Sequence, residues 1–309
     1  MNHKVVYAVV VTYKRKNLLE QVLNGLLAQT YYLTKIIIVD NNSQDGTQEL
    51  IEKIIAERHS QDCEIEYHNT MANLGGAGGF EYGFKAADAD DREYDYLWLM
   101  DDDLLPAQEC LEILVSSAGI GAEIVQPLRI NLDGSCAELS PVVYNLSAPW
   151  LINPKRESVM QKMLKEQPTE PFEIAGIPFE GPLISRSVIK EIGYPNPAFF
   201  IFNDDLDFAL RARKSGAKII CQPNAVATRL LLNNQGNDLK SWKGYFMLRN
   251  HFYILRQHGE NFLVKLRPIA MVATFCFLYL FKGDFKLVKT CFRAFIDSKN
   301  LSNNDIYKP

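Results

Sequence analysis

Three consecutive aspartates, Asp101, Asp102 and Asp103, come directly after an apolar segment at residues 96–100. Adjacent carboxylates repel one another, so a structure that holds them together normally requires a cation, and oxygen ligands favour Mg²⁺ or Mn²⁺. Because side chains alternate along an extended segment, we expect Asp101 and Asp103 to share one face and to hold a metal against a diphosphate, while Asp102 points elsewhere. A solvated acidic turn is the alternative, but such turns seldom follow so apolar a segment.

A second acidic cluster, Asp204, Asp205 and Asp207, stands between the aromatic-rich residues 199–202 and a helix-like segment. A carboxylate in such a place is suited to general-base chemistry, since the transfer of a sugar to a hydroxyl, for example, requires a group that accepts the hydroxyl proton. Capping of the following helix by Asp204 is the alternative. A cap alone does not account for three acids.

Three further polar clusters follow predicted strands, at residues 12–15, 40–47 and 73–79. In an open α/β sheet, ligands bind beyond the carboxyl ends of the strands, and the aspartates at 101–103 occupy the same kind of place. Each cluster alone is weak evidence, and Asp40 could simply cap a helix. Their coincidence indicates a nucleotide-binding edge of the sheet.

The glycines of residues 73–79 are expected to let the backbone and a helix N-terminus approach a nucleotide or sugar closely. They do not match the dinucleotide-binding pattern GxGxxG, which would need glycine at Glu81, and no GK[ST] sequence occurs in the chain. An NAD enzyme and a P-loop NTPase are therefore disfavoured.

The elements that must position these residues read as an α/β protein. The first 130 residues alternate β-branched and amphipathic segments in a βαβαβαβ order, which predicts a mostly parallel sheet covered by helices. The predicted strands are residues 5–11, 36–39, 64–68, 96–100 and 123–126. We expect a catalytic domain at residues 1–230, with a nucleotide-binding part at 1–130 and an acceptor and base part at 131–230, and a helical region at 231–309.

The second part of the chain gives weaker patterns. Prolines interrupt residues 131–169, which predicts an irregular insertion. In the block that follows, the sequence predicts strands at 174–178 and 198–202 and helices at 185–192 and 204–214.

Composition narrows the function and the location. A formal net charge of −4 disfavours a general nucleic-acid binder. Six cysteines without a CxxC pair indicate reduced thiols, and the absence of a signal-peptide pattern predicts a cytoplasmic location. The apolar residues 268–281, followed by lysines, are expected to be too short to span a membrane, which leaves a helix on the membrane surface or in the core.

Together these residues resemble glycosyltransferase family 2, a group of inverting enzymes with the GT-A fold, over residues 4–255. The resemblance rests on residues 12–15, 40–47, 101–103 and 203–205, and on residues 242–250, which are similar to the family's Tyr-Tyr-x-x-Arg-Asn helix near the donor phosphates. It implies a Rossmann-like, mostly parallel central sheet flanked by helices, with a helical C-terminal extension.

The resemblance also implies roles. Asp205 is the implied base, with Asp204 beside it, and Asp101 and Asp103 are the implied ligands of Mn²⁺ or Mg²⁺. The implied donor-binding residues are Thr12, Arg15, Asp40, Asn73, Gly75, Gly76, Asp102 and Arg249. Where the family usually completes the metal site with a histidine, residues 225–229 contain none. Arg229, by neutralising the diphosphate, and His251 are the two alternatives.

Residues 73–80 are similar to the corresponding loop of bacterial galactofuranosyltransferases, and rhamnosyltransferases are close in pattern. We therefore expect UDP-galactofuranose as the donor, with dTDP-rhamnose as the second choice. The expected acceptor is a growing cell-surface polysaccharide on a polyprenyl-phosphate lipid, at the inner face of the membrane, and a homo-oligomer is left open. A nucleotidyltransferase and a non-catalytic sugar-nucleotide binder are the alternatives of another class.

Overall fold

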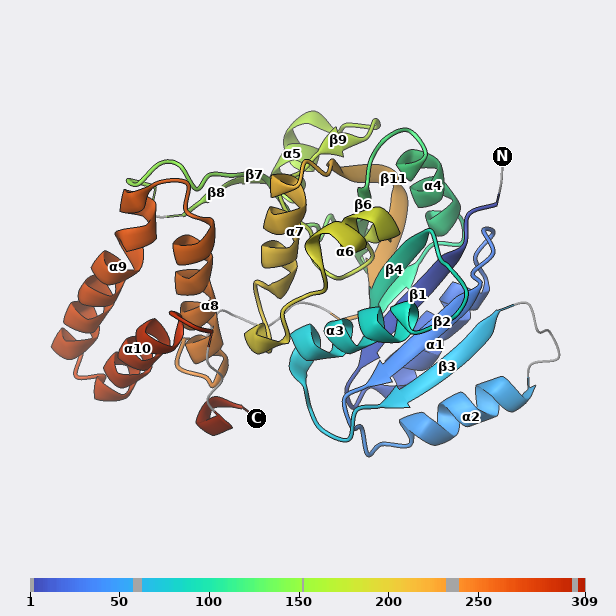
Figure 1. The fold of residues 1–309 in the computed structure, drawn as a ribbon, viewed down its shortest axis with the longest axis horizontal. Helices are drawn as coiled ribbons and strands as arrows, with labels where there is room; N and C mark the ends of the chain where they lie inside the picture. The colour runs from blue at the N-terminus through green and yellow to red at the C-terminus, as the bar shows by residue number, and fades with distance from the viewer. Residues whose placement is uncertain (1–2, 58–62, 152, 232–238, 302–304, 309) are drawn as a thin grey trace.

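The computed structural model describes residues 3–57, 63–151, 153–231, 239–301 and 305–308 (Figure 1). The strands are β1 Val6–Thr12, β2 Lys35–Asp40, β3 Glu64–Asn69, β4 Tyr96–Asp101, β5 Leu104–Pro106, β6 Ile124–Asn131, β7 Pro141–Tyr144, β8 Lys155–Ser158, β9 Phe172–Glu173, β10 Leu183–Ser185 and β11 Ile219–Arg229. The helices are α1 Lys16–Leu27, α2 Thr47–Glu57, α3 Gly75–Asp88, α4 Cys110–Ala118, α5 Val159–Glu166, α6 Arg186–Ile192, α7 Asp204–Lys214, α8 Lys243–His258, α9 Phe262–Phe281 and α10 Phe285–Asp297, with short 3-10 helices η1 Pro197–Phe199 and η2 Asp305–Tyr307.

The central sheet has the strand order β3-β2-β1-β4-β10-β6-β11-β5, and β9 pairs with β11. β1 runs parallel to β2 and β4, and β2 runs parallel to β3, which confirms the predicted βαβαβαβ order and the mostly parallel sheet. β10 is antiparallel to both of its neighbours, β4 and β6. It brings residues 180–183, which are distant in the sequence, beside the end of β4.

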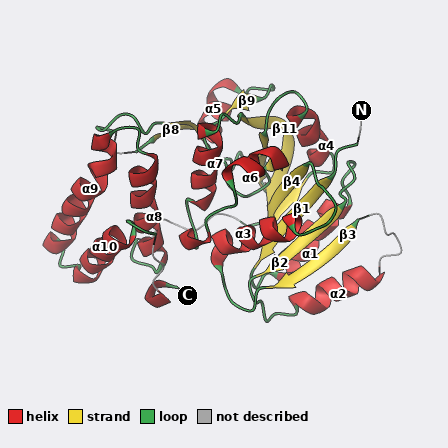
Figure 2. Ribbon diagram, in the orientation of Figure 1, coloured by secondary structure: helices red, strands yellow, loops and turns green. Residues whose placement is uncertain are grey.

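Helices cover both faces of the sheet (Figure 2). Because side chains alternate along a strand, residues 7, 9 and 11 of β1 pack into one hydrophobic cluster with α3, α6 and α7. Residues 6, 8 and 10 pack into a second cluster with α1, α2 and α4. β1 is therefore buried on both faces, as its continuous apolar sequence requires.

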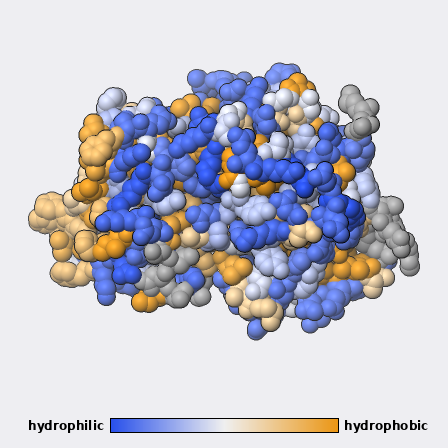
Figure 3. All heavy atoms as spheres, viewed as in Figure 1, coloured by the Kyte–Doolittle hydropathy of each residue, from blue (hydrophilic) through white to orange (hydrophobic). Residues whose placement is uncertain are grey.

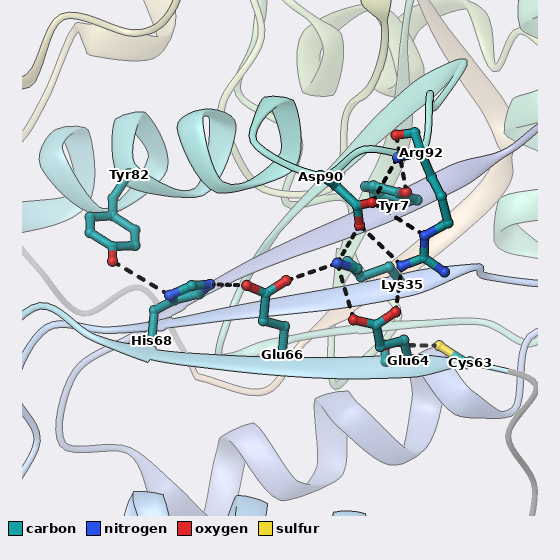
Figure 4. A network of polar contacts seen from close by, with 9 residues as sticks. All are labelled: Tyr7, Lys35, Cys63, Glu64, Glu66, His68, Tyr82, Asp90 and Arg92. Atoms are coloured by element: carbon teal, nitrogen blue, oxygen red, sulfur yellow. Dashed lines mark hydrogen bonds and ion pairs between the residues drawn. The ribbon is translucent and has the colours of Figure 1, made fainter.

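A network of polar side chains links the start of β2 to β3 and to the segment before β4 (Figure 4). The Lys35 ammonium at the start of β2 lies 3.1 Å from Glu64 Oε1 and 2.9 Å from Glu66 Oε2, and it also contacts Asp90. Lys35 is 5% exposed, and these three carboxylates raise its pKa despite its burial. The network lies at the opposite strand ends from the polar clusters at Thr12 and Asp40, so it stabilises the fold and leaves the other edge of the sheet for chemistry.

Three C-terminal helices, α8, α9 and α10, pack against one another beside the α/β unit (Figure 1). α9 is twenty residues long because it begins at Phe262, six residues before the apolar segment counted in the sequence, and includes Lys265 and Arg267. By length and composition it is long enough and apolar enough to cross a membrane, so the prediction that this segment is too short is wrong. Only 22% of its most apolar stretch is buried.

Two predicted strands are wrong. Residues 198–202 comprise the end of η1 and the turn that follows it, and Phe200 and Phe202 have positive φ of 64° and 66°, which no strand permits. Residues 174–178 are irregular, and the short strand β9 lies just before them. The predicted helices at 185–192 and 204–214 are confirmed as α6 and α7. The insertion at 131–169 holds the β7–β8 hairpin and α5.

Candidate active site

A cavity of about 580 Å³ opens at the carboxyl ends of β1 and β4, where the sequence places its polar clusters. Side chains from distant segments meet in its wall, including residues that immediately precede or belong to α8. Its lining residues are Val11, Thr12, Tyr13, Arg15, Asn41, Asn73, Gly75, Gly76, Asp101, Asp102, Asp103, Glu180, Phe200, Ile201, Phe202, Arg229, Trp242, Lys243 and Met247. Eight of the twelve predicted site residues line this one cavity, and Asp40, Asp204, Asp205 and Arg249 do not.

Asp102, the middle aspartate, is held by the protein itself. Its carboxylate accepts a hydrogen bond of 2.8 Å from the Thr12 hydroxyl and one of 3.2 Å from the Tyr13 backbone N–H. Arg15 Nη1 lies 2.9 Å from Asp102 Oδ1 and 3.2 Å from Asp103 Oδ2. Asp102 therefore ties the ends of β1 and β4 together and fixes the Arg15 guanidinium in the cavity wall.

Among the described residues Asp101 has no ion-pair partner, and Asp103 shares Arg15 with Asp102. Burial, followed by the charges of Glu180 and Asp103, raises the pKa of Asp101 well above its usual range. Burial also raises the pKa of Asp103, although Arg15 opposes the shift. A bound cation would relieve this repulsion.

Asp101 and Asp103 can supply two of the ligands of a divalent cation. Among the residues that the structure describes, no group of three or more His, Cys, Asp or Glu side chains is arranged as a metal site. Mg²⁺ is commonly held by one or two carboxylates together with substrate phosphates and water, and Asp101 and Asp103 suit that arrangement. His251 does not line the cavity, and burial lowers its pKa to about 4.

The glycine-rich loop forms the start of α3. Asn73 Oδ1 accepts a hydrogen bond of 2.9 Å from Gly75 N, and Asn41 Nδ2 donates one of 3.1 Å to Gly75 O. Gly75 has φ of +71°, and a Cβ there would lie 2.2 Å from the carbonyl oxygen of Phe200. A Cβ on Gly76 would meet no atom within 4 Å. Gly75 therefore serves the fold, whereas Gly76 leaves space beside the cavity.

Asp204 and Asp205 begin α7, directly after the turn at residues 198–203. Burial raises the pKa of Asp205 to about 6; the Leu206 N–H opposes this shift and the charge of Glu180 adds to it. Burial and the charge of Asp205 raise the pKa of Asp204 well above its usual range. A carboxylate with a pKa near 6 is suited to accept a proton at neutral pH.

Arg249 does not face the cavity, in contrast to the expectation for a phosphate ligand. It is fully buried in α8, and its Nη2 donates hydrogen bonds of 2.7 Å and 2.9 Å to the carbonyl oxygens of Ala198 and Phe199. Lys243 and Met247, four residues apart on the same helix, are the ones that line the cavity. Arg249 lies two residues beyond Met247, which places it on another side of the helix.

Asp40 is also fully buried and lies outside the cavity wall. Its carboxylate accepts hydrogen bonds of 2.7 Å from the Tyr67 hydroxyl and 2.8 Å from the Ser43 N–H. In the sheet it is the partner of Thr12, so it lies next to the cavity rather than in it.

Glu180 is the main residue that the sequence prediction missed. It lines the cavity, contacts Arg129, and has Oε2 3.4 Å from Arg229 Nε. Burial alone would raise the pKa of Glu180, but the charges of Arg129 and Arg229 outweigh it and lower the pKa. A single glutamate in an irregular segment gives no local signal, and only the pairing of β10 with β4 brings it to Asp101.

Comparison with known proteins identifies the family of this chain. The model of glycosyl transferase family 2 matches residues 7–193. The chain is 30% identical over 294 residues to galactofuranosyltransferase GlfT1 of Mycolicibacterium smegmatis, covering 87% of this chain and 88% of the relative. It is 32% identical over 217 residues to galactofuranosyltransferase GlfT1 of Mycobacterium tuberculosis strain H37Rv, covering 68% of this chain and 65% of the relative.

Solved structures show the same fold at low identity. The mannosyltransferase PcManGT from Pyrobaculum calidifontis, in complex with GDP-Man and Mn²⁺, superposes with a TM-score of 0.56 at 16% identity, covering 98% of this chain and 77% of that one. GalNAc-T7 with UDP, GalNAc and Mn²⁺ gives a TM-score of 0.59 at 16% identity, covering 81% of this chain and about half, 51%, of that one. The chain belongs to glycosyltransferase family 2 and has the GT-A fold.

Proposed function

We propose that this member of glycosyltransferase family 2 transfers galactofuranose from UDP-galactofuranose to a hydroxyl of a growing cell-surface glycan, with inversion at the anomeric carbon. Its similarity to galactofuranosyltransferase GlfT1 over most of both chains supports this donor over dTDP-rhamnose. Family membership disfavours a nucleotidyltransferase and a non-catalytic sugar-nucleotide binder.

The chemistry requires one base and one means of stabilising a leaving group. Asp205 accepts the proton of the acceptor hydroxyl, whose oxygen forms the new bond to the anomeric carbon. On the opposite side the bond to the diphosphate oxygen breaks, and its electron pair leaves with UDP. A divalent cation held by Asp101 and Asp103 would neutralise charge on that diphosphate. Thr12, Arg15, Asn73 and Gly76 line the space for the donor.

The observation that carries this proposal is that Asp101 and Asp103 line the same cavity as Phe200, Ile201 and Phe202. These three residues belong to the turn that leads directly into Asp204 and Asp205 at the start of α7. The arrangement supports a metal site at the end of β4 and a base at the start of α7 that act on one donor. A single displacement needs its base and its leaving-group site close to each other.

Release of UDP, measured with and without a galactan-type acceptor, tests the proposal. UDP-galactofuranose should give acceptor-dependent release, whereas UDP-galactopyranose, which differs only in ring size, and dTDP-rhamnose should give little. NMR of the product should show inverted anomeric configuration. Preferred use of dTDP-rhamnose, or a product with retained configuration, would contradict the donor or the mechanism respectively.

We also propose that the acceptor is linked to a polyprenyl phosphate and that the enzyme works at the inner face of the membrane. Apolar side chains gather at the outer edge of the C-terminal helices, at the left of the molecule (Figure 3). We call this set the apolar edge; it comprises Phe277, Leu278, Leu280, Phe281, Phe285 and Phe292, which are 47–78% exposed. Lys282, Lys286 and Lys289 are exposed in the same part of the chain, and their positive charges would attract anionic lipid headgroups.

Packing favours a helix that lies on the membrane over one that crosses it. Val272 of α9 is buried against Cys291 and Ala294 of α10 and against residues of α8. A helix that crossed the bilayer would have to give up these contacts, whereas one that rests on its surface would keep them.

A further inference from the structure

Arg229 ends β11 and lies beside the acidic cluster. The backbone N–H of the next residue, Leu230, donates a hydrogen bond of 2.8 Å to the carbonyl oxygen of Asp103, and Arg229 is the sheet partner of Leu104. Its side chain lines the cavity. The guanidinium therefore faces the space that the donor would fill.

The guanidinium of Arg229 has little to bind in this structure. Its side chain is 13% exposed, and among the described residues its ion-pair partner is Glu180, with Nε 3.4 Å from Oε2. The buried Nε has no hydrogen-bond partner. Arg129, by comparison, makes hydrogen bonds of 2.7 Å and 3.0 Å to Glu138 in addition to its contact with Glu180.

Charge in the cavity also favours an anion near Arg229. Four carboxylates line it, from Asp101, Asp102, Asp103 and Glu180, along with the basic side chains of Arg15, Arg229 and Lys243. Arg15 is already occupied by Asp102 and Asp103. Once a divalent cation offsets the acids, the lining is net positive, and a guanidinium with unused donors matches the oxygens of a diphosphate.

We infer that Arg229 binds the diphosphate of the sugar nucleotide and carries part of the charge that develops on it when the anomeric bond breaks. This inference rests on the proposed function. The guanidinium stays protonated throughout, so it stabilises the leaving electron pair without transferring a proton. Arg229 belongs to residues 225–229, the segment in which the family usually has a metal-binding histidine.

Calorimetric titration of the full chain with UDP and with uridine, in EDTA and in MnCl₂, tests the inference. For Arg229→Gln, UDP affinity should fall by about 10- to 100-fold under both conditions, because a hydrogen bond to a charged group contributes about 1.5–3 kcal/mol. Uridine, which lacks phosphate, should bind as it does to the wild type. Arg213→Gln, which removes an exposed arginine of α7, is the matched control and should change neither affinity.

Two further variants separate binding from a structural role. If Arg229 only holds Glu180 in place, Glu180→Gln and Arg229→Gln should weaken UDP binding equally, which would overturn the inference, as would unchanged UDP affinity in Arg229→Gln. A parallel loss of uridine affinity would indicate a collapsed cavity and would also overturn the inference. In that case Arg229→Lys, which keeps the charge, should show no partial recovery of UDP affinity. A wild-type chain that bound neither UDP nor dTDP would reject the proposed donor class itself.

Discussion

The hydroxyl of Thr12 donates a hydrogen bond of 2.8 Å to the carboxylate of Asp102, and so joins the ends of β1 and β4. Asp102 is thereby occupied, and we expect Asp101 and Asp103 to hold the cation, although Asp103 also pairs with Arg15. We expect Asp103→Asn to lower the Mn²⁺-supported rate on the order of 100-fold. Titration with Mn²⁺ in the presence of UDP, followed by electron paramagnetic resonance, should show that Asp103→Asn binds Mn²⁺ more weakly than the wild type does. Asp102→Asn should instead lower the melting temperature, and a reversed pattern would contradict the assignment.

Asp205→Asn should reduce turnover by about 10²- to 10⁴-fold, because the amide cannot accept the acceptor proton. Affinity for UDP should stay within about twofold of the wild type, since Asp205 does not line the donor cavity. Steady-state rates together with calorimetric titration measure both effects. Normal rates in this variant would show that another group is the base.

The pH dependence follows from the same residue. Because burial raises the pKa of Asp205 to about 6, we expect its carboxylate to lose the ability to accept a proton as the pH falls through that value. The value of kcat/KM should therefore rise with pH through about 6 and level off about one pH unit higher. A profile that stays flat down to pH 4 would contradict the proton-accepting role.

Gly75 and Gly76 form a matched pair. Gly75→Ala should destabilise the protein, because the added methyl group would collide with the Phe200 carbonyl and φ is positive there. Gly76→Ala meets no protein atom and should keep or slightly raise the melting temperature, yet raise the KM for the donor, since the methyl group takes space beside the cavity. Thermal unfolding and donor titration distinguish the two, and an unchanged KM in Gly76→Ala would place the donor elsewhere.

Liposome flotation tests the apolar edge. Replacement of Phe277 and Phe281 by serine, or of Lys282, Lys286 and Lys289 by glutamate, should reduce binding to vesicles that contain anionic lipid, while activity on a soluble acceptor is retained. These side chains are exposed, so the substitutions should leave the helix packing intact. Unchanged flotation combined with a change in molar mass would instead indicate an interface between copies of the chain.

His258 Nε2 lies 2.7 Å from Asp207 Oδ1, which links α8 to α7. Burial alone would raise the pKa of Asp207, but the hydrogen bond with His258 and the charge of Arg211 outweigh it and lower the pKa. A carboxyl whose folded pKa is depressed stabilises the protein above its unfolded pKa of about 3.9, and this contribution is lost as the pH falls through the folded pKa. Asp207→Asn should therefore cost about 3–5 kcal/mol near neutral pH. Urea unfolding should show this difference shrinking below about pH 4, and a constant difference would contradict the linkage.

The sequence predicts the part of the site that local patterns encode. Thr12, the glycines near 75 and the aspartates at 101–103 each follow a strand or open a helix, so parallel pairing brings them to one edge without further information. The turn at 198–203 escaped prediction because its left-handed residues are held from outside the segment. Asn250 Nδ2 donates hydrogen bonds to the carbonyl oxygens of Phe199, Ile201 and Phe202.

The burial of Arg249 escaped prediction for a related reason. A motif gives the spacing of a helix but not its rotation against the core, and a rotation of half a turn exchanges a cavity-facing side chain for an inward one. Glu180 likewise acquires its neighbours only through the antiparallel strand β10.

Because Arg249 and Asn250 of α8 hold the turn that leads into Asp204 and Asp205 by hydrogen bonds, the conformation of that turn depends on a helix some fifty positions downstream. A chimaera that borrows its C-terminal tail from another enzyme should therefore keep α8 and make its junction near Gly259. A junction placed before α8 would remove the side chains whose hydrogen bonds hold this turn in place.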